Sequence, residues 1–192
     1  MSSEIQLIVG LGNPGSQYEQ TRHNAGFWFL DQLAAKNNVS FKSEKRFFGD
    51  FCKIMFDGRE IKLLKPMTFM NRSGQGVAAL ANFFKIPVEN ILVAHDELDF
   101  PVGKIRLKKG GGHGGHNGLR DIIAQLGSKD FFRLRIGIDH PGSSDQVTGY
   151  VLGKPKTEDR IDIENSIDSV IAIVDQLASG EIQKATQTLH RD

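Results

Sequence analysis

The sequence contains one cysteine, one tryptophan and two tyrosines, and it lacks any long apolar run. A single cysteine, Cys52, excludes an intramolecular disulfide and a cysteine-based metal cluster, and we interpret it as a buried apolar side chain. No stretch approaches the roughly 20 apolar residues that a membrane-spanning helix needs. Residues 1–4 have neither the basic nor the apolar part of a secretory signal. These absences predict a cytoplasmic protein without membrane association.

An excess of charge of one sign is also lacking, since 24 Lys and Arg balance 23 Asp and Glu. The charge is nevertheless uneven: residues 101–140 carry eight basic side chains against three acidic ones. A local basic patch on a neutral body is compatible with binding of a phosphate or of a nucleic-acid end. The alternative is that these basic side chains form an ordinary solvent-exposed face that binds no ligand.

The chain length favours a single domain that spans residues 1–192. Along it, the apolar pattern alternates between strand-like and helix-like segments. Short apolar runs, alternation and an Asp57-Gly58 turn predict strands at 7–9, 47–56, 60–64, 91–94, 104–108 and 132–138. Apolar residues at helical spacing predict helices at 21–37, from 71 or 73 to just before Pro87, at 117–126 and at 163–177. We therefore expect an α/β fold, with helices on both faces of a twisted, mixed and mostly parallel sheet. Residues 140–157 predict a loop long enough to act as a lid.

Residues 10–15 spell G-x-G-x-x-G after a predicted strand, which is the fingerprint of a dinucleotide site. In that fold a helix begins at the third glycine, and its N–H groups hold pyrophosphate. Here residues 16–20 intervene, Pro14 removes a donor, and no acidic residue ends a second strand about 20 positions later. A dinucleotide-dependent oxidoreductase is therefore a weaker alternative.

His23 lies near the start of a predicted helix, and Asp96 follows a predicted buried strand. Because the carboxyl ends of parallel strands meet at one edge of a sheet, these side chains are candidates for a pair. A carboxylate bound to one imidazole nitrogen leaves the other nitrogen as a general base. No serine or cysteine lies in a nucleophile motif, so water is the natural nucleophile. A structural or surface role for His23 is the alternative.

Residues 110–118 contain six glycines, so this backbone can approach a ligand closely. The segment lacks the ending of a nucleotide-binding P-loop. His113 and His116 alone do not make a metal site, and no metal is predicted. Three amide side chains, Asn13, Asn71 and Asn117, lie in separate predicted strand-to-helix loops. Such groups, converging on one cleft, suit recognition of an ester or peptide carbonyl.

These motifs together resemble those of bacterial peptidyl-tRNA hydrolases. The matching segments follow one another along nearly the whole chain, at 9–15, Tyr18 with 21–26, 65–74, 95–99, 110–119, 132–138, 140–142 and 150–155. The departures from the family pattern are small, at residues 100–103 and at Arg72, and they leave the candidate chemistry unchanged.

The resemblance implies a cytoplasmic, typically monomeric enzyme that needs no cofactor. It would hydrolyse the ester between a peptide and the 3′ end of tRNA, and so recycle tRNA from prematurely released peptidyl-tRNA. It implies that His23 is the general base, that Asp96 is its partner, and that Asn13 helps to distinguish peptidyl from aminoacyl substrates. The other implied site residues comprise a substrate-cleft set, Tyr18, Phe69, Met70, Asn71 and Asn117, and a grip on the tRNA 5′ phosphate, Lys108 and Arg135.

The residues agree with this resemblance at two points. Ester hydrolysis needs only an activated water and a polarised carbonyl, because the ribose hydroxyl is a good leaving group. Strand 104–108, with Arg133 and Arg135, is expected to form the basic patch that phosphate binding requires. A non-catalytic RNA-binding or RNA-chaperone domain would use the same patch and is the second alternative.

Overall fold

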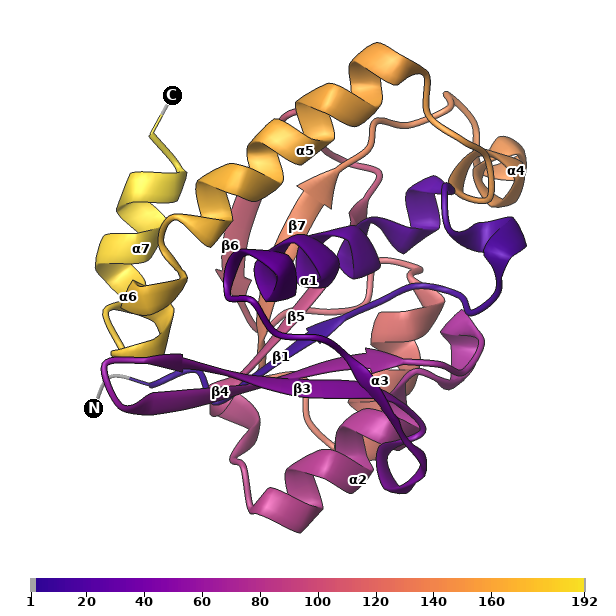
Figure 1. The fold of residues 1–192 in the computed structure, drawn as a ribbon. Helices are drawn as coiled ribbons and strands as arrows, with labels where there is room; N and C mark the ends of the chain where they lie inside the picture. The colour runs from indigo at the N-terminus through magenta and orange to yellow at the C-terminus, as the bar shows by residue number, and fades with distance from the viewer. Residues whose placement is uncertain (1–2, 192) are drawn as a thin grey trace.

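The strands of this protein form one mixed sheet in the order β2-β3-β4-β1-β5-β7-β6 (Figure 1). The computed structural model describes residues 3–191; residues 1, 2 and 192, including the first two residues used to exclude a signal, lie outside the described part. The strands are β1 (Leu7–Gly10), β2 (Lys42–Glu44), β3 (Gly49–Phe56), β4 (Arg59–Pro66), β5 (Ile91–Glu97), β6 (Ile105–Lys109) and β7 (Phe132–Gly137).

The four central strands of the sheet are parallel. Strand β1 pairs in parallel with β4 and β5, and β5 pairs in parallel with β7. The β2–β3, β3–β4 and β6–β7 pairs are antiparallel and lie toward the two edges. The predicted mixed sheet with a mainly parallel centre is confirmed.

Helices cover both faces of the sheet, as predicted, and each face has its own apolar core (Figure 1). One face carries α1 (Ala25–Lys36), α5 (Thr157–Ile171), α6 (Val174–Ala178) and α7 (Ile182–Leu189). The other carries α2 (Gly74–Phe84) and α3 (Asn117–Leu126). No helix within residues 3–191 has the length and apolar character needed to cross a membrane.

The start of α1 crosses the carboxyl ends of β1 and β5 at two glycines. A Cβ on Gly26 would lie 2.4 Å from the carbonyl oxygen of Ala94, and one on Gly10 would lie 2.3 Å from the carbonyl oxygen of Gly26. Any side chain at either position would push the helix away from the sheet. This close crossing places the residues that precede α1 beside the end of β5.

The first predicted helix begins later than expected. Residues 22–24 form a 3₁₀ turn, η2 (Arg22–Asn24), in which the N–H of Asn24 donates to the carbonyl of Thr21, three residues back, at 3.0 Å. The α-helical pattern starts only at Ala25. His23 therefore lies in a tight turn rather than in the first turn of an α-helix.

Two further segments differ from the sequence-based prediction. The predicted loop at 140–157 contains η6 (Ser144–Gln146) and α4 (Val147–Val151). The predicted single helix at 163–177 is broken because Ile173, with φ −118°, leaves the helical conformation, so α5 and α6 are separate and α7 follows. The remaining 3₁₀ turns are η1 (Ser16–Tyr18), η3 (Lys45–Phe47), η4 (Met70–Arg72) and η5 (Val88–Asn90).

Candidate active site

The carboxyl ends of the parallel strands open onto a cleft of about 920 Å³. Its wall contains Asn13 after β1, His23 in η2, Asp96 near the end of β5 and Asn117 at the start of α3. This edge of a parallel sheet is where α/β proteins place ligands. The fold thus gathers polar side chains from four distant parts of the sequence.

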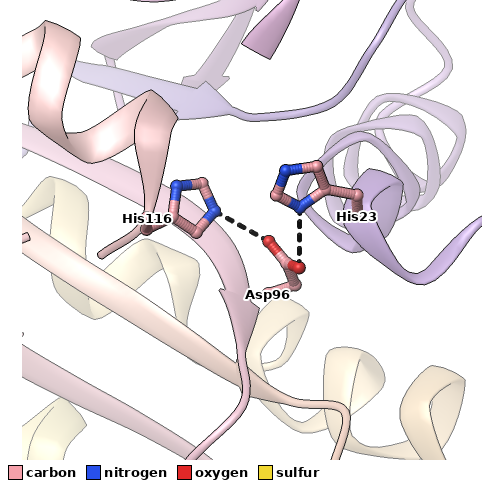
Figure 2. Close-up of side chains that lie close together, drawn as sticks. All are labelled: His23, Asp96 and His116. Carbon is pink, nitrogen blue, oxygen red and sulfur yellow. Dashed lines mark hydrogen bonds and ion pairs between the residues drawn. The ribbon is translucent and has the colours of Figure 1, made fainter. Parts of the chain in front are cut away.

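Asp96 is buried, and both of its carboxylate oxygens have a histidine partner (Figure 2). Nδ1 of His23 lies 2.8 Å from Oδ2, and Nε2 of His116 lies 2.8 Å from Oδ1. The two imidazole rings are tilted by 45° with their centroids 5.1 Å apart. One buried carboxylate therefore holds two histidines that line the cleft.

The start of α3 determines which nitrogen of His116 carries a proton. Nδ1 of His116 accepts hydrogen bonds from the N–H groups of Gly118, at 3.1 Å, and Leu119, at 3.3 Å. A nitrogen that accepts carries no proton, so the proton of this ring lies on Nε2. The capped helix therefore holds His116 as a hydrogen-bond donor to Asp96.

In His23 it is Nδ1 that contacts the Asp96 carboxylate, whereas in His116 it is Nε2. Because the Asp96 carboxylate can only accept, Nδ1 of His23 carries the proton of their hydrogen bond. Nε2 has no hydrogen-bond partner within residues 3–191, and the ring lines the cleft. The neutral ring consequently offers a lone pair to a molecule in the cleft, as a general base requires.

Burial and the neighbouring carboxylate act in opposite directions on His23. Burial alone would lower the pKa of the His23 imidazole, but the charge and hydrogen bond of Asp96 raise it above its ordinary value of 6.5. Burial alone would likewise raise the pKa of the Asp96 carboxyl, but the two imidazole rings outweigh it and hold that pKa below its ordinary range. Asp96 is therefore ionised wherever the protein is folded near neutral pH.

The hydrogen bonds of the cluster argue against a metal ion at this position. One ligand atom from each of His23, Asp96 and His116 lies within 4.8 Å of the other two. A metal on Nε2 of His116 would move the ring proton to Nδ1, and that nitrogen already accepts from two N–H groups of α3. The arrangement of donors and acceptors favours the hydrogen-bonded cluster over metal binding.

Asn13 is held rigidly from two sides. Its backbone N–H donates to Oδ1 of Asn24 at 2.9 Å, and its backbone carbonyl accepts from Nδ2 of Asn24 at 3.0 Å. Its side-chain Oδ1 accepts from the N–H of Met70 at 2.8 Å. Because the oxygen is already occupied, Asn13 offers the cleft the N–H donors of its Nδ2 group.

The other predicted substrate residues are distributed along the cleft wall. Phe69, Met70, Asn71 and Asn117 line it, with Phe69 exposed and Met70 buried. Tyr18 is not part of this wall but packs edge-on against Phe69, with the ring centroids 6.3 Å apart. Val147, Thr148 and Val151 of helix α4 also line the cleft, so the segment predicted to be long enough for a lid borders it.

The predicted basic residues differ in burial: Lys108 is exposed, Arg135 is half-buried and Arg133 is buried. Lys108 and Arg135 line the cleft, and Nε of Arg135 lies 2.7 Å from Oε1 of Glu97. Arg133 is 3% exposed, and its guanidinium donates to backbone carbonyls rather than facing solvent. Arg133 therefore lies on the same strand face as the expected basic patch, but backbone carbonyls rather than solvent surround its guanidinium.

The structure also removes the basis for the dinucleotide alternative. After Gly15 the chain forms the 3₁₀ turn η1, and α1 begins only at Ala25. The glycine segment therefore has no α-helix N-terminus directly behind it to hold pyrophosphate.

Sequence reasoning assigned no role to two residues that shape this site. His116 binds Asp96, and the available signal was its position directly before a predicted helix, where a side-chain acceptor caps the first turn. Asn24 fixes the backbone of Asn13, and nothing in its sequence context indicated a contact 11 residues away. His95 contacts the ring of His116 edge-on, and burial lowers the pKa of the His95 imidazole to about 4.

Comparisons with known proteins match this chain along almost its full length. The profile of the family described as peptidyl-tRNA hydrolase matches residues 7–192. The peptidyl-tRNA hydrolase of Neisseria meningitidis serogroup C is 56% identical over 190 residues, covering 99% of each chain. That of Coxiella burnetii is 56% identical, covering 99% of this chain and 100% of its own.

A solved structure agrees with these sequence matches. The crystal structure of peptidyl-tRNA hydrolase from Acinetobacter baumannii superimposes with a TM-score of 0.95 at 50% identity, covering 98% of this chain and 96% of that chain. The structural match therefore covers nearly the same length of the chain as the sequence matches do. The chain belongs to the peptidyl-tRNA hydrolase family.

Proposed function

We propose that this protein hydrolyses the ester that joins a peptide to the 3′-terminal ribose of tRNA, releasing free tRNA and peptide from prematurely released translation products. The observation that carries the proposal is the state of His23, whose Nδ1 is held by Asp96 while Nε2 faces the cleft. We further propose that the enzyme acts in the cytoplasm as a one-domain monomer without a cofactor.

His23 acts as the general base in this proposal. Its Nε2 takes a proton from a water molecule, whose oxygen attacks the ester carbonyl carbon to give a tetrahedral oxyanion. Collapse breaks the bond to the ribose oxygen, and that oxygen takes the proton from His23. One water is consumed, and a carboxylic acid and a hydroxyl are formed. Asp96 stabilises the imidazolium that exists between the two proton transfers.

Amide side chains supply recognition in the same cleft. The free Nδ2 group of Asn13 suits a carbonyl acceptor, because its Oδ1 already accepts from Met70. A peptidyl substrate carries an amide carbonyl next to the terminal residue, and a free aminoacyl group does not. Asn71 and Asn117 line the cleft near this position and complete a set of neutral donors and acceptors.

Lys108 and Arg135 form the phosphate grip in this proposal. Both line the cleft, and Lys108 has no ion-pair partner within residues 3–191. Arginine presents several N–H donors, so Arg135 can keep its contact with Glu97 and still face a phosphate. Tyr18 contributes to the substrate site through its edge-on contact with Phe69, which lines the cleft.

The direct test of the activity compares an N-acetylated aminoacyl-tRNA with the unblocked aminoacyl-tRNA. We expect the purified protein to cleave the blocked substrate, to act much more slowly on the unblocked one, and to keep its activity in EDTA. Tight tRNA binding without cleavage would favour an RNA-binding domain, and activity lost in EDTA and restored by a divalent ion would establish a metal enzyme.

The pH profile should report the state of His23. Because only the neutral ring accepts a proton, kcat/KM should fall as the pH falls through the pKa of His23. The Asp96 interaction raises this pKa, so the midpoint of the acidic limb is expected above 6.5. Initial rates on the blocked substrate between pH 5 and 9, about the range in which histidine titrates, would measure it. A midpoint at or below the ordinary value would contradict the role of Asp96.

The phosphate grip predicts a separation of binding from chemistry. Lys108→Ala and Arg135→Ala should raise KM for full-length substrate and leave kcat nearly unchanged, because phosphate contacts are equal in ground and transition states. Each lost contact should also reduce the salt slope of tRNA binding by about 0.7–0.9.

The control for the grip is a minimal peptidyl-nucleotide that lacks the tRNA body. On this fragment both variants should resemble the wild type. Equal losses on the fragment and on full-length substrate would mean that Lys108 and Arg135 shape the reacting site instead of holding phosphate.

A further inference from the structure

Four basic side chains lie on one face of the β6–β7 pair. In this antiparallel pair Lys108 lies opposite Arg133, and Arg106 lies opposite Arg135. Leu107 and Leu134, between them, belong to the core shared with α5, α6 and α7, so the basic side chains point to the other face. Like charges directly opposite each other destabilise a sheet. Of the four, Arg135 is paired with Glu97, whereas Lys108 lines the cleft and has no ion-pair partner within residues 3–191.

Arg133 is the buried member of this group. Its Nη1 donates to the carbonyl of Gly112 and its Nη2 to the carbonyl of Gly111, both at 2.6 Å. Nη2 also lies 3.1 Å from the carbonyl of Lys129. No carboxylate pairs with this guanidinium among residues 3–191, and its Nε has no hydrogen-bond partner there. All the hydrogen bonds of Arg133 therefore go to backbone, and two of them fix consecutive residues of the glycine-rich segment.

These two hydrogen bonds determine where the neighbouring N–H groups point. In a trans peptide unit the C=O and N–H bonds are antiparallel. Holding the carbonyls of Gly111 and Gly112 against Arg133 therefore turns the N–H groups of Gly112 and His113 away from it. Both residues line the cleft, and a Cβ on Gly112 would meet no atom within 4 Å. No hydrogen bond within residues 3–191 occupies either N–H group.

Lys108 lies against the same segment. A Cβ on Gly111 would lie 2.9 Å from Nζ of Lys108, so the ammonium group rests beside this glycine. Gly111 has φ +102°, a conformation that favours glycine, and this leaves the space for the ammonium group. The Lys108 ammonium therefore lies beside the same short segment, residues 111–113, that carries the two free N–H groups. Arg133 holds this segment through the carbonyls of Gly111 and Gly112.

We infer that Arg133 is a positioning residue for tRNA binding: it orients the Gly111–Gly112 backbone so that the N–H groups of Gly112 and His113, together with Lys108, bind one phosphate group of the substrate. Arg133 itself does not touch the phosphate. The inference rests on the phosphate grip proposed above and adds two backbone donors to it. Oriented backbone N–H groups beside a cation are a recurrent way of binding phosphate.

The test uses Arg133→Lys and Arg133→Gln in the full-length protein. Lysine keeps the charge but cannot hold two carbonyls with a planar fork, and glutamine removes the charge. Both variants should raise KM for N-acetyl-aminoacyl-tRNA by about tenfold, which corresponds to the loss of one to two hydrogen bonds. On the minimal peptidyl-nucleotide, kcat and KM should stay within about twofold of the wild type, which also reports that the protein is folded.

A matched control and a double-mutant cycle separate positioning from other roles. Lys184→Ala removes one positive charge from α7, on the other face of the sheet, and should leave both substrates unaffected. Combined with Lys108→Ala, either Arg133 variant should raise KM less than the product of the single effects, because the two residues act on the same phosphate.

Each other outcome contradicts a defined part of this proposal. Wild-type KM in Arg133→Lys would mean that Arg133 acts by charge alone. Equal losses on both substrates would mean that it supports the whole site, and fully multiplicative effects with Lys108→Ala would mean that the residues act independently. If Lys108→Ala itself leaves KM unchanged, the phosphate grip is wrong; if only the Arg133 variants leave it unchanged, the grip stands and this inference fails.

Discussion

Replacing His23 by alanine is expected to lower kcat on N-acetyl-aminoacyl-tRNA by about 10²–10⁴-fold, the usual contribution of a general base. The affinity for tRNA should not change, because the imidazole contacts the reacting water rather than the tRNA body. Single-turnover cleavage at saturating enzyme would measure the loss in the chemical step, and equilibrium binding of uncharged tRNA would measure the affinity.

Two variants control for indirect effects of removing His23. His23→Asn keeps an N–H donor for the buried Asp96 carboxylate but has no basic nitrogen, so it should be as inactive as His23→Ala. His140→Ala removes another histidine of the cleft wall, one whose Nδ1 accepts from Gly142 and that has no contact with Asp96, and it should retain activity. Near-wild-type turnover of a folded His23→Ala protein would remove His23 from the mechanism.

The central strands could be predicted from sequence because their burial is uniform. Leu7, Ile8 and Val9 are all fully buried, as are Leu92 and Val93, since helices cover both faces of the parallel centre. Such strands read as continuous apolar runs rather than as alternation. Because the carboxyl ends of parallel strands meet at one edge of the sheet, the predicted strands indicated where polar residues would lie close together. His23 and Asp96 could therefore be paired from the sequence.

Helix α4 could not be predicted, because long-range contacts hold it in place. Nη1 of Arg22 donates to the carbonyl of Tyr150 at 2.9 Å, and its guanidinium lies 3.9 Å from the centre of the Tyr150 ring. The Tyr150 hydroxyl donates to the carbonyl of Ile138 at 2.5 Å. A helix of five residues has too few internal hydrogen bonds to be stable alone. Its existence depends on residues more than 100 positions away in the chain.

Local sequence patterns also did not predict the contacts that surround the candidate site residues. Alternation placed Arg133 and Arg135 on one face of a strand but could not tell that Arg133 would be covered by the glycine-rich segment. The glycines indicated a backbone close to a ligand, yet not which carbonyls would be held. Likewise, the sequence did not predict that His116 donates to Asp96, because the cap of α3 places its proton.

The Asp96→Asn variant is expected to lose about as much activity as His23→Ala, about 10²–10⁴-fold in kcat. From the sequence alone a smaller effect is expected, because Asp96 does not touch the substrate. The structure changes this expectation through His116. The cap of α3 keeps the proton of His116 on Nε2, so this ring must donate to residue 96. An asparagine would therefore turn its single oxygen toward His116.

The amide nitrogen of the asparagine would then face Nδ1 of His23 and donate to it. Nδ1 would have to accept, and the proton of the neutral ring would move to Nε2. His23 would present an N–H instead of a lone pair to the water, so the base would be lost although every side chain stays in place. Steady-state kinetics on the blocked substrate would measure the loss, and unchanged tRNA binding would show that the cleft is intact.

A double variant tests this explanation directly. In Asp96→Asn/His116→Ser, serine can still cap α3 but is too short to reach residue 96. The asparagine amide is then free to rotate and to offer its oxygen to Nδ1–H of His23, which restores the lone pair on Nε2. We expect the double variant to be at least about tenfold more active than Asp96→Asn, the recovery of one correctly oriented hydrogen bond. His116→Ser alone, which keeps the carboxylate, should lose less activity than Asp96→Asn. If the double variant is no more active than Asp96→Asn, the protonation state of His23 is not set by this network, and Asp96 acts through its charge alone.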